Sequence, residues 1–204
     1  MIPPFLALYG VITENKTIVE EAFTQVRLYR EFLRDDRTGV WRHSVLGDNP
    51  DAGFYATGRR GTPLIKQQAL TPLTGNGWAA AGMLRVYGTI KNSRFGREMD
   101  DELDDLEDWV KEIHESVYHK YFVGSFYNSL TDLHSSSMQD SESTVRNYLN
   151  DNGTFYDAAA TAFLASTVYR ASTLMDEHEF IPFAERTRMT LFTPNGGVGA
   201  DSNG

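Results

Sequence analysis

The chain has 204 residues, of which 41% are hydrophobic, so it is long and apolar enough for one domain with a sizeable core. Its 28 acidic and 19 basic residues give a formal net charge of −9, which disfavours the capture of nucleic acid. The absence of cysteine excludes disulfides, thiolate metal sites and a cysteine nucleophile, and no apolar run is long enough to predict a membrane protein.

The first predicted helix begins near Thr17, because Thr17-Ile18-Val19-Glu20 fits a capping box in which Glu20 reaches back. Apolar residues at helical spacing continue this pattern: Val19, Ala22, Phe23, Val26 and Leu33. The stretch Asp35–Gly39 then breaks the pattern as a turn. Residues 40–45 alternate apolar and polar, which favours a short strand or an extended arm.

Later segments alternate between two kinds of helix. Residues 79–91 and 156–175 are apolar around nearly the whole circumference, which is typical of helices buried on all sides. Residues 97–118 instead have one apolar stripe and a largely acidic opposite face, and a last helix is predicted over 179–192. The alternation predicts an all-α fold with two concentric helical layers, as in an α/α toroid, while a helical bundle or a helical repeat stays open.

Two patterns that suggest metals are weak. His114 and His119 are five residues apart, which places them roughly 140° apart around a helix and on different faces. The acidic run 100–108 has no glycine at the sixth position of a calcium loop, so we expect a solvated helix face. Neither a Gly-x-Ser-x-Gly motif nor a phosphate-binding loop is present, so serine nucleophiles and nucleotide binding have no support.

Two short stretches remain as candidate sites. In Gly39-Val40-Trp41-Arg42-His43 a turn leads to an aromatic residue and a histidine, and spacing alone favours an ordinary surface or core role for His43. In Gly75-Asn76-Gly77-Trp78 two glycines permit positive φ and close backbone approach just before a predicted helix N-terminus. Trp78 either presents its ring to a ligand or anchors the core, and both interpretations stay open.

The stretch GNGWAAAGMLRV resembles the signature of the unsaturated glucuronyl and rhamnogalacturonyl hydrolases, glycoside hydrolase families 88 and 105. The stretches MIPPFLALYGV, TGVWRH, TIKNS, LEDWVKEI and FYDAAATAFLASTVYR follow the same resemblance in the right order, and together they resemble the eukaryotic branch of family 105. The resemblance covers most of residues 1–195. It implies a single partial domain over 1–204 that forms an incomplete (α/α)6 barrel, about half of the toroid.

The resemblance also implies a chemistry. Such enzymes remove an unsaturated uronyl residue from oligosaccharides left by pectin-type lyases. An aspartic acid protonates the C4=C5 enol ether, water adds at C5, and the hemiketal collapses with loss of the aglycone. The resemblance implies an oligosaccharide substrate without a metal or cofactor. The residues that it implies contact the sugar are Trp41, His43, Asn76, Gly77 and Trp78.

Two departures from the family pattern shape the expected activity. The family's catalytic aspartate precedes a Met-x-x-Pro-Phe-Leu element that here is residues 1–6, so the resemblance places it before Met1 and we expect no catalytic residue in the chain. Residues 59–75 interrupt the family pattern, and removing them restores FYATGNGWAAAG. We expect this segment to be a non-family insertion from a retained intron or a misassigned gene structure.

Several expectations stay open at this stage. Bacterial members commonly carry an arginine two residues before GNGW, and none stands at Leu73 or Thr74, so the uronate carboxylate has no assigned contact. Asp157 matches a family position, and its place before a helix predicts an N-terminal cap. The alternative function is a non-catalytic helical protein that binds carbohydrate or a partner, and another (α/α)6 enzyme such as an epimerase is a third. The start of the chain shows no secretion signal, and localisation, aglycone and oligomeric state are open.

Overall fold

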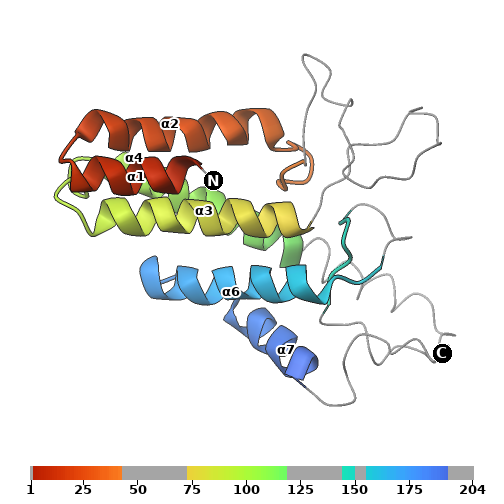
Figure 1. Ribbon diagram of the computed structural model, residues 1–204. Helices are drawn as coiled ribbons and strands as arrows, with labels where there is room; N and C mark the ends of the chain where they lie inside the picture. Colours follow the sequence, from red (N-terminus) through yellow and green to blue (C-terminus); the bar gives the residue numbers. More distant parts are fainter. Residues whose placement is uncertain (1, 43–72, 119–143, 150–154, 193–204) are drawn as a thin grey trace, which may run out of the picture.

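The computed structural model describes residues 2–42, 73–118, 144–149 and 155–192 (Figure 1). Six helices lie in these ranges: α1 (Ile2–Ile12), α2 (Lys16–Leu33), α3 (Leu73–Lys91), α4 (Asp100–Glu115), α6 (Ala158–Leu174) and α7 (Ile181–Phe192). Within the same residues β pairing is confined to two isolated antiparallel bridges, Arg34 with Trp41 and Arg146 with Tyr156. The all-α prediction is confirmed.

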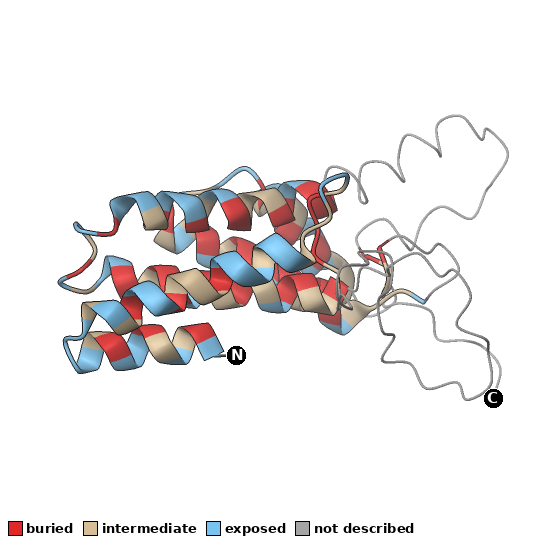
Figure 2. Ribbon diagram, turned by 90° about the horizontal axis from the view of Figure 1, so that it is seen from above, coloured by how far each residue is buried: buried red, intermediate tan, exposed pale blue. Residues whose placement is uncertain are grey.

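The helices form two layers. In the first layer α3 lies between α1 and α6 and contacts both. In the second, α2 packs on α1, α4 packs on α3, and α7 packs on α6. The three helices of the first layer run in the same direction, and α3 and α6 begin at the same end of the molecule, whereas α1 begins beside the middle of α3 (Figure 1). Buried residues gather between the layers, as Figure 2 shows in red.

The sequence pattern explains this layering. α3 and α6 combine small residues with large apolar ones around most of their circumference, which lets each helix pack against neighbours on several sides. α4 instead buries a single stripe, made of Leu103, Leu106, Trp109, Val110 and Ile113. Its carboxylates at Asp100, Asp101, Asp104, Asp105 and Asp108 are exposed, so the acidic run is a solvated helix face as predicted.

Two features of the first helices differ from the prediction. α2 begins at Lys16 rather than after Thr17, because Asn15 is its cap and its side chain accepts a hydrogen bond from the Ile18 N–H at 3.4 Å. α1 was not predicted, although Pro3 and Pro4 suit the first turn of a helix, where no intrahelical N–H is required. The prediction of a short strand or an extended arm over 40–45 is consistent with the antiparallel bridge of Trp41 with Arg34, and residues 43–45 lie outside the described ranges.

The start of α3 is the largest correction. The helix begins at Leu73, six residues before the predicted start, so Gly75 and Gly77 are helical and do not form a turn. Leu73 is fully buried and its N–H donates to the carbonyl of Asn147 at 2.9 Å. Among the described residues the glycine with positive φ is Gly39. Of the expected insertion, residues 59–72 lie outside the described ranges, and the rest forms the first turn of α3.

Candidate functional site

The side chain of Asn76 holds the backbone of Trp41. The Trp41 N–H donates to Asn76 Oδ1 at 2.8 Å, and Asn76 Nδ2 donates to the Trp41 carbonyl at 3.1 Å. Both residues are buried, with the side chain of Asn76 fully enclosed. A primary amide offers one acceptor and two donors, so it satisfies both backbone groups of a residue that has no helix or sheet partner for them. Asn76 therefore joins the first turn of α3 to the segment that follows the turn Asp35–Gly39.

The predicted turn delivers Trp41 to this position. The Gly39 N–H donates to the carbonyl of Asp35 at 2.7 Å, and the Arg37 N–H donates to Asp35 Oδ1 at 2.9 Å. Gly39 has φ of +79°, and a Cβ there would collide with Oγ of Ser116 at the end of α4. A side chain at this position is therefore excluded both by the backbone conformation and by the lack of space.

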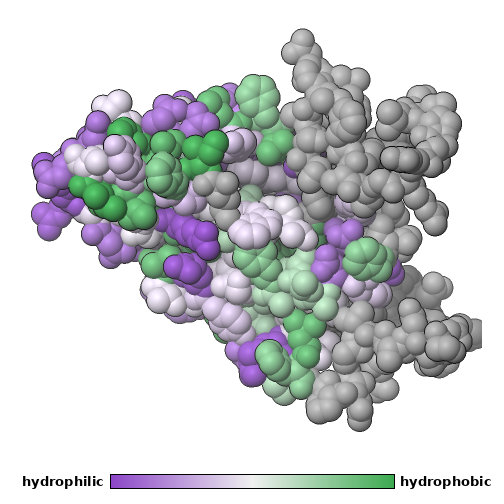
Figure 3. Space-filling model, in the orientation of Figure 1, coloured by the Kyte–Doolittle hydropathy of each residue, from purple (hydrophilic) through white to green (hydrophobic). Residues whose placement is uncertain are grey.

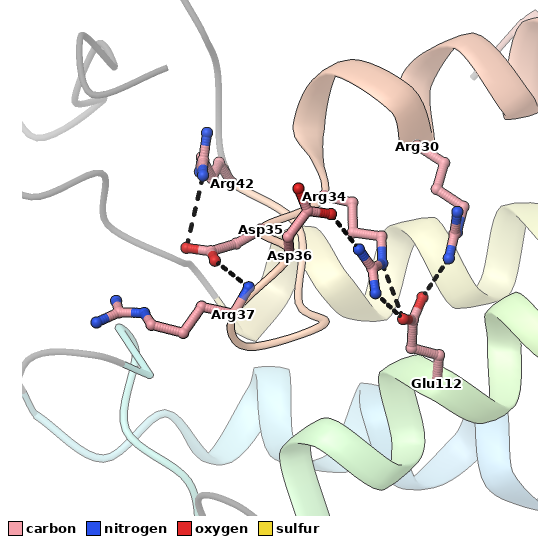
Figure 4. A network of polar contacts seen from close by, with 7 residues as sticks. All are labelled: Arg30, Arg34, Asp35, Asp36, Arg37, Arg42 and Glu112. Atoms are coloured by element: carbon pink, nitrogen blue, oxygen red, sulfur yellow. Dashed lines mark hydrogen bonds and ion pairs between the residues drawn. The ribbon is translucent and has the colours of Figure 1, made fainter.

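A charged network fixes the end of α2 beside this turn (Figure 4). Glu112 of α4 accepts a hydrogen bond from Arg30 Nη2 at 2.8 Å and another from Arg34 Nε at 2.8 Å, and Arg34 also pairs with Asp36. Partial burial raises the pKa of Glu112, but the hydrogen bonds from Arg34 and Arg30 outweigh it and leave this pKa below its ordinary value. Glu112 thus stays ionised and has a structural role.

Trp78 is the exposed aromatic residue of the GNGW stretch. Its side chain is 49% exposed, and its ring meets the ring of Phe163 from α6 edge-on, with centroids 4.7 Å apart. Gly77 makes this packing possible, because a Cβ there would lie 2.8 Å from Cδ1 of Phe163. The ring of Trp78 therefore packs against Phe163 while part of its surface stays exposed.

The other predicted site residues are placed differently. Trp41 is only 7% exposed, and its indole Nε1 has no hydrogen-bond partner among the described residues. Its ring therefore packs in the core instead of lying open beside Trp78. His43 lies outside the described residues. The structure thus brings Trp41, Asn76, Gly77 and Trp78 together, with one ring exposed and the other three residues buried.

Arg146 lies at the end of the molecule where α3 and α6 begin. Asp157 caps α6 by accepting a hydrogen bond from the Ala160 N–H at 2.8 Å, as predicted. The guanidinium of Arg146 lies 4.3 Å from the centroid of the Tyr156 ring and donates to its hydroxyl at 3.2 Å. Parallel helices that begin together present positive dipole ends, which favour an anionic ligand. No motif in the sequence marks Arg146.

The buried histidine is a core residue. His114 is fully buried, and its Nε2 lies 2.8 Å from Oγ1 of Thr167. Thr167 donates its own proton to the carbonyl of Leu164, so Nε2 of His114 is the donor and Nδ1 is unprotonated. Burial lowers the pKa of His114 to about 4, and the charge of Glu177 acts weakly in the other direction. His119 lies outside the described residues.

The described residues hold no group of three or more histidine, aspartate or glutamate side chains that could bind a metal ion. Nor does any helix within the described ranges have the length and apolar character needed to cross a membrane.

A family model for glycosyl hydrolase family 88 matches residues 1–191. The chain belongs to glycosyl hydrolase family 88. The match spans α1 to α6, nearly all of α7 and the GNGW stretch of this family member. No curated protein matches the chain.

Solved structures extend the comparison to the fold. Possible members of the GH105 family from Salmonella enterica serovar Paratyphi A and from Klebsiella pneumoniae align with TM-scores of 0.64 and 0.63 at 20% and 19% identity. Both alignments cover 98% of this chain and 44% of the other. A polysaccharide lyase aligns with a TM-score of 0.63 at 14% identity, over 97% of this chain and 49% of its own. The family 88 chain therefore has the fold of an incomplete (α/α)6 barrel and spans less than half the length of these structures.

Proposed function

We propose that the protein is part of a hydrolase that removes an unsaturated galacturonyl residue from rhamnogalacturonan or pectin oligosaccharides. The observation that carries the proposal is the family 88 match over residues 1–191, which includes the GNGW stretch. In the reaction a proton adds to C4 of the C4=C5 enol ether, water adds at C5, and the hemiketal collapses and releases the aglycone.

The described residues support a sugar-binding role for one end of the barrel. Trp78 offers an aromatic surface of the kind that packs against the C–H groups of a sugar, and Phe163 holds its ring. Asn76 and Gly77 act by positioning, because Asn76 binds the Trp41 backbone and Gly77 admits Phe163. Arg146 and the helix N-termini favour the uronate carboxylate at this end.

The proton donor is proposed to lie outside the 204 residues. Three carboxylates close to this part of the fold already have structural partners: Glu112 binds Arg30 and Arg34, Asp157 caps α6, and Asp35 holds its own turn. Each of these three carboxylates is thus engaged by a contact within the protein. We therefore expect the chain to bind the substrate and not to hydrolyse it unaided.

The test follows the absorbance of the enol ether in an unsaturated galacturonyl-rhamnose disaccharide. The 204-residue chain is compared with a version that is extended upstream by the family segment bearing the aspartate and that lacks residues 59–75. Loss of absorbance only with the rebuilt chain supports the proposal. Hydrolysis by the 204-residue chain alone would contradict the proposal that the proton donor lies outside it.

A non-catalytic carbohydrate-binding protein is the second candidate. It is favoured by the combination of an exposed, positioned Trp78 with three nearby carboxylates that are all in structural roles. Binding of the disaccharide without hydrolysis by either version would establish this alternative. Neither binding nor hydrolysis would refute both candidates.

A further inference from the structure

The turn between α1 and α2 contains an acceptor motif for N-linked glycosylation. Asn15-Lys16-Thr17 has the pattern Asn-x-Ser/Thr, and its middle residue is not proline. A motif of three residues also arises by chance, so its structural surroundings decide whether it can carry a glycan. A glycan is bulky and polar, so the asparagine that carries it must lie at the surface with its amide nitrogen available.

Asn15 meets the first of these two conditions. Asn15 and Thr17 are both exposed, and so are Thr13 and Glu14 just before them. The end of the molecule where α1 ends and α2 begins, at the left of Figure 1, shows many hydrophilic residues in purple in Figure 3. A glycan on Asn15 can therefore extend into solvent from this turn without displacing a buried side chain.

Asn15 meets the second condition because its side chain uses only its oxygen. Oδ1 accepts the hydrogen bond from the Ile18 N–H that caps α2, whereas Nδ2 donates no hydrogen bond to the described residues. N-glycosylation replaces one hydrogen of Nδ2 and leaves Oδ1 as it is. The cap and a glycan are thus compatible on one side chain. Capping alone does not require asparagine, because aspartate and serine cap about equally well.

The contacts that hold this turn form late during synthesis. Lys16 pairs with Glu98 at 3.1 Å, from the segment that connects α3 to α4. Glu14 pairs with Arg94 of the same segment at 2.8 Å, and the two residues lie 80 positions apart. Both partners are absent when the motif emerges, and the ends of a helix open at the lowest free energy. The first turn of α2 is therefore accessible to a modifying enzyme at that stage.

We propose that Asn15 is the attachment site of an N-linked glycan. The donor is an oligosaccharide on a polyprenyl diphosphate, and an oligosaccharyltransferase brings it to the chain. Nδ2 of Asn15 forms a bond to C1 of the first sugar, and the bond between C1 and the diphosphate oxygen breaks. The lipid diphosphate leaves, and Nδ2 loses one proton.

The glycan lies at the end of the molecule opposite to the candidate sugar site. Trp78 belongs to the beginning of α3, whereas the turn that contains Asn15 is paired through Glu14 with Arg94, just after the end of α3. The 19 residues of α3 separate these two ends by about 28 Å. The proposed modification therefore leaves the candidate site open. It is independent of the proposed hydrolytic activity, because no substrate takes part in it.

Cell-free translation with endoplasmic-reticulum microsomes tests the proposal on the full 204-residue chain behind a cleavable signal sequence. The background substitution Asn152→Gln removes the second Asn-x-Thr motif, which lies outside the described residues. We expect a product of higher mass whose shift is removed by peptide N-glycosidase, with the deamidation that this enzyme leaves mapped to Asn15. Thr17→Ala should abolish the shift although it keeps Asn15, and Thr17→Ser should retain it. No shift, or a shift that persists in Thr17→Ala, would overturn the proposal.

The second measurement asks whether the folded protein tolerates the glycan. Circular dichroism compares the glycosylated chain with the same chain after removal of the glycan and with Asn15→Asp, which keeps a capping oxygen but has no nitrogen to modify. We expect equal helical signals and thermal midpoints that agree within about 2 °C. A midpoint that rises by more than about 5 °C on removal of the glycan would show that the fold excludes it and would also overturn the proposal.

Discussion

The amide of Asn76 satisfies both backbone polar groups of Trp41, a residue 35 positions earlier in the chain. Asn76 belongs to the GNGW family signature, and its described hydrogen bonds are to the protein backbone. Asn76 holds the segment that continues from Trp41 towards His43, and Trp78, two positions later, faces outward. One short stretch combines a buried side chain that holds the backbone with an exposed aromatic ring.

Asn76→Ala should destabilise the fold by about 2–4 kcal/mol. The substitution leaves a buried N–H and a buried carbonyl of Trp41 without these partners, and each unsatisfied group costs about 1–3 kcal/mol. Urea unfolding followed by circular dichroism measures the free energy of unfolding. Asn92→Ala, which removes an exposed hydrogen bond to the carbonyl of Gly88, is the control and should cost less than about 1 kcal/mol. Equal stability of the two variants would contradict the positioning role.

Gly77→Ala should destabilise the protein by about 1–3 kcal/mol although alanine favours helices. The added Cβ would lie 2.8 Å from Phe163 Cδ1, so the ring that supports Trp78 must move. The matched control is Gly88→Ala in the same helix, where the Cβ would meet Leu174 at an ordinary 3.4 Å and where we expect a neutral or slightly stabilising effect. Thermal unfolding and Trp fluorescence report both effects. A stabilising Gly77→Ala would show that Phe163 does not press on this position.

Glu112→Gln should lower the free energy of unfolding by about 2 kcal/mol, a value between those for surface and buried ion pairs. The substitution leaves Arg30 and Arg34 without the carboxylate that binds both, in a half-buried position. Glu14→Gln removes an exposed pair with Arg94 and should change the free energy of unfolding by less than about 0.5 kcal/mol. Urea titrations of the three proteins at one pH and salt concentration make the comparison. Similar costs for the two variants would mean that the network does not anchor α2.

His114 should make stability fall as the solution is acidified. The pKa of His114 is about 4 in the folded protein and takes its ordinary value of 6.5 in the unfolded chain, so the unfolded chain takes up the proton first. The contribution is fully present above about pH 6.5 and is lost as pH falls towards 4. Between pH 7.5 and pH 5 this amounts to about 2 kcal/mol.

The variant His114→Gln isolates this effect. Glutamine keeps a donor for Thr167 but has no proton to gain, so its free energy of unfolding should fall by about 2 kcal/mol less than that of the wild type over the same pH interval. An equal loss of unfolding free energy in the two proteins would show that His114 does not govern the pH dependence of stability.

Trp78→Ala should weaken binding of the unsaturated disaccharide by about tenfold or more, because it removes the exposed ring and keeps the helix. Isothermal titration calorimetry measures the affinity. Tyr29→Ala removes a ring of similar exposure from α2 and should leave binding unchanged. If the two variants bind alike, Trp78 is not part of the sugar site.

Local patterns predicted much of the fold. The amphipathic stripe of α4, the apolar circumference of α6 and the Asp157 cap each depend on residues within a few turns of one another. The start of α3 was mispredicted for the opposite reason. Gly75 and Gly77 indicate a turn when only neighbours are considered, whereas Gly77 is small because it faces Phe163, 86 positions later.

The sequence predicts a set of candidate site residues, but it does not predict the contacts that these residues make. The sequence could not show that Asn76 binds the Trp41 backbone, because the partner is defined by packing and not by a motif. The cap at Asn15 rather than Thr17 has a similar origin, since the Asn15 N–H donates to the carbonyl of Gly10 and fixes the turn between α1 and α2. His43 stays a predicted site residue.

The ion pairs of Glu112 also bear on the order of events during synthesis. Arg34 and Arg30 lie 78 and 82 positions before Glu112, so the end of α2 leaves the ribosome long before its anchor exists. At translation rates of about 5–20 residues per second this interval is about 4–16 s, far longer than a helix needs to form. The charged end of α2 and the turn after it therefore lack this anchor until α4 emerges, whereas the packing of α2 on α1 can form earlier.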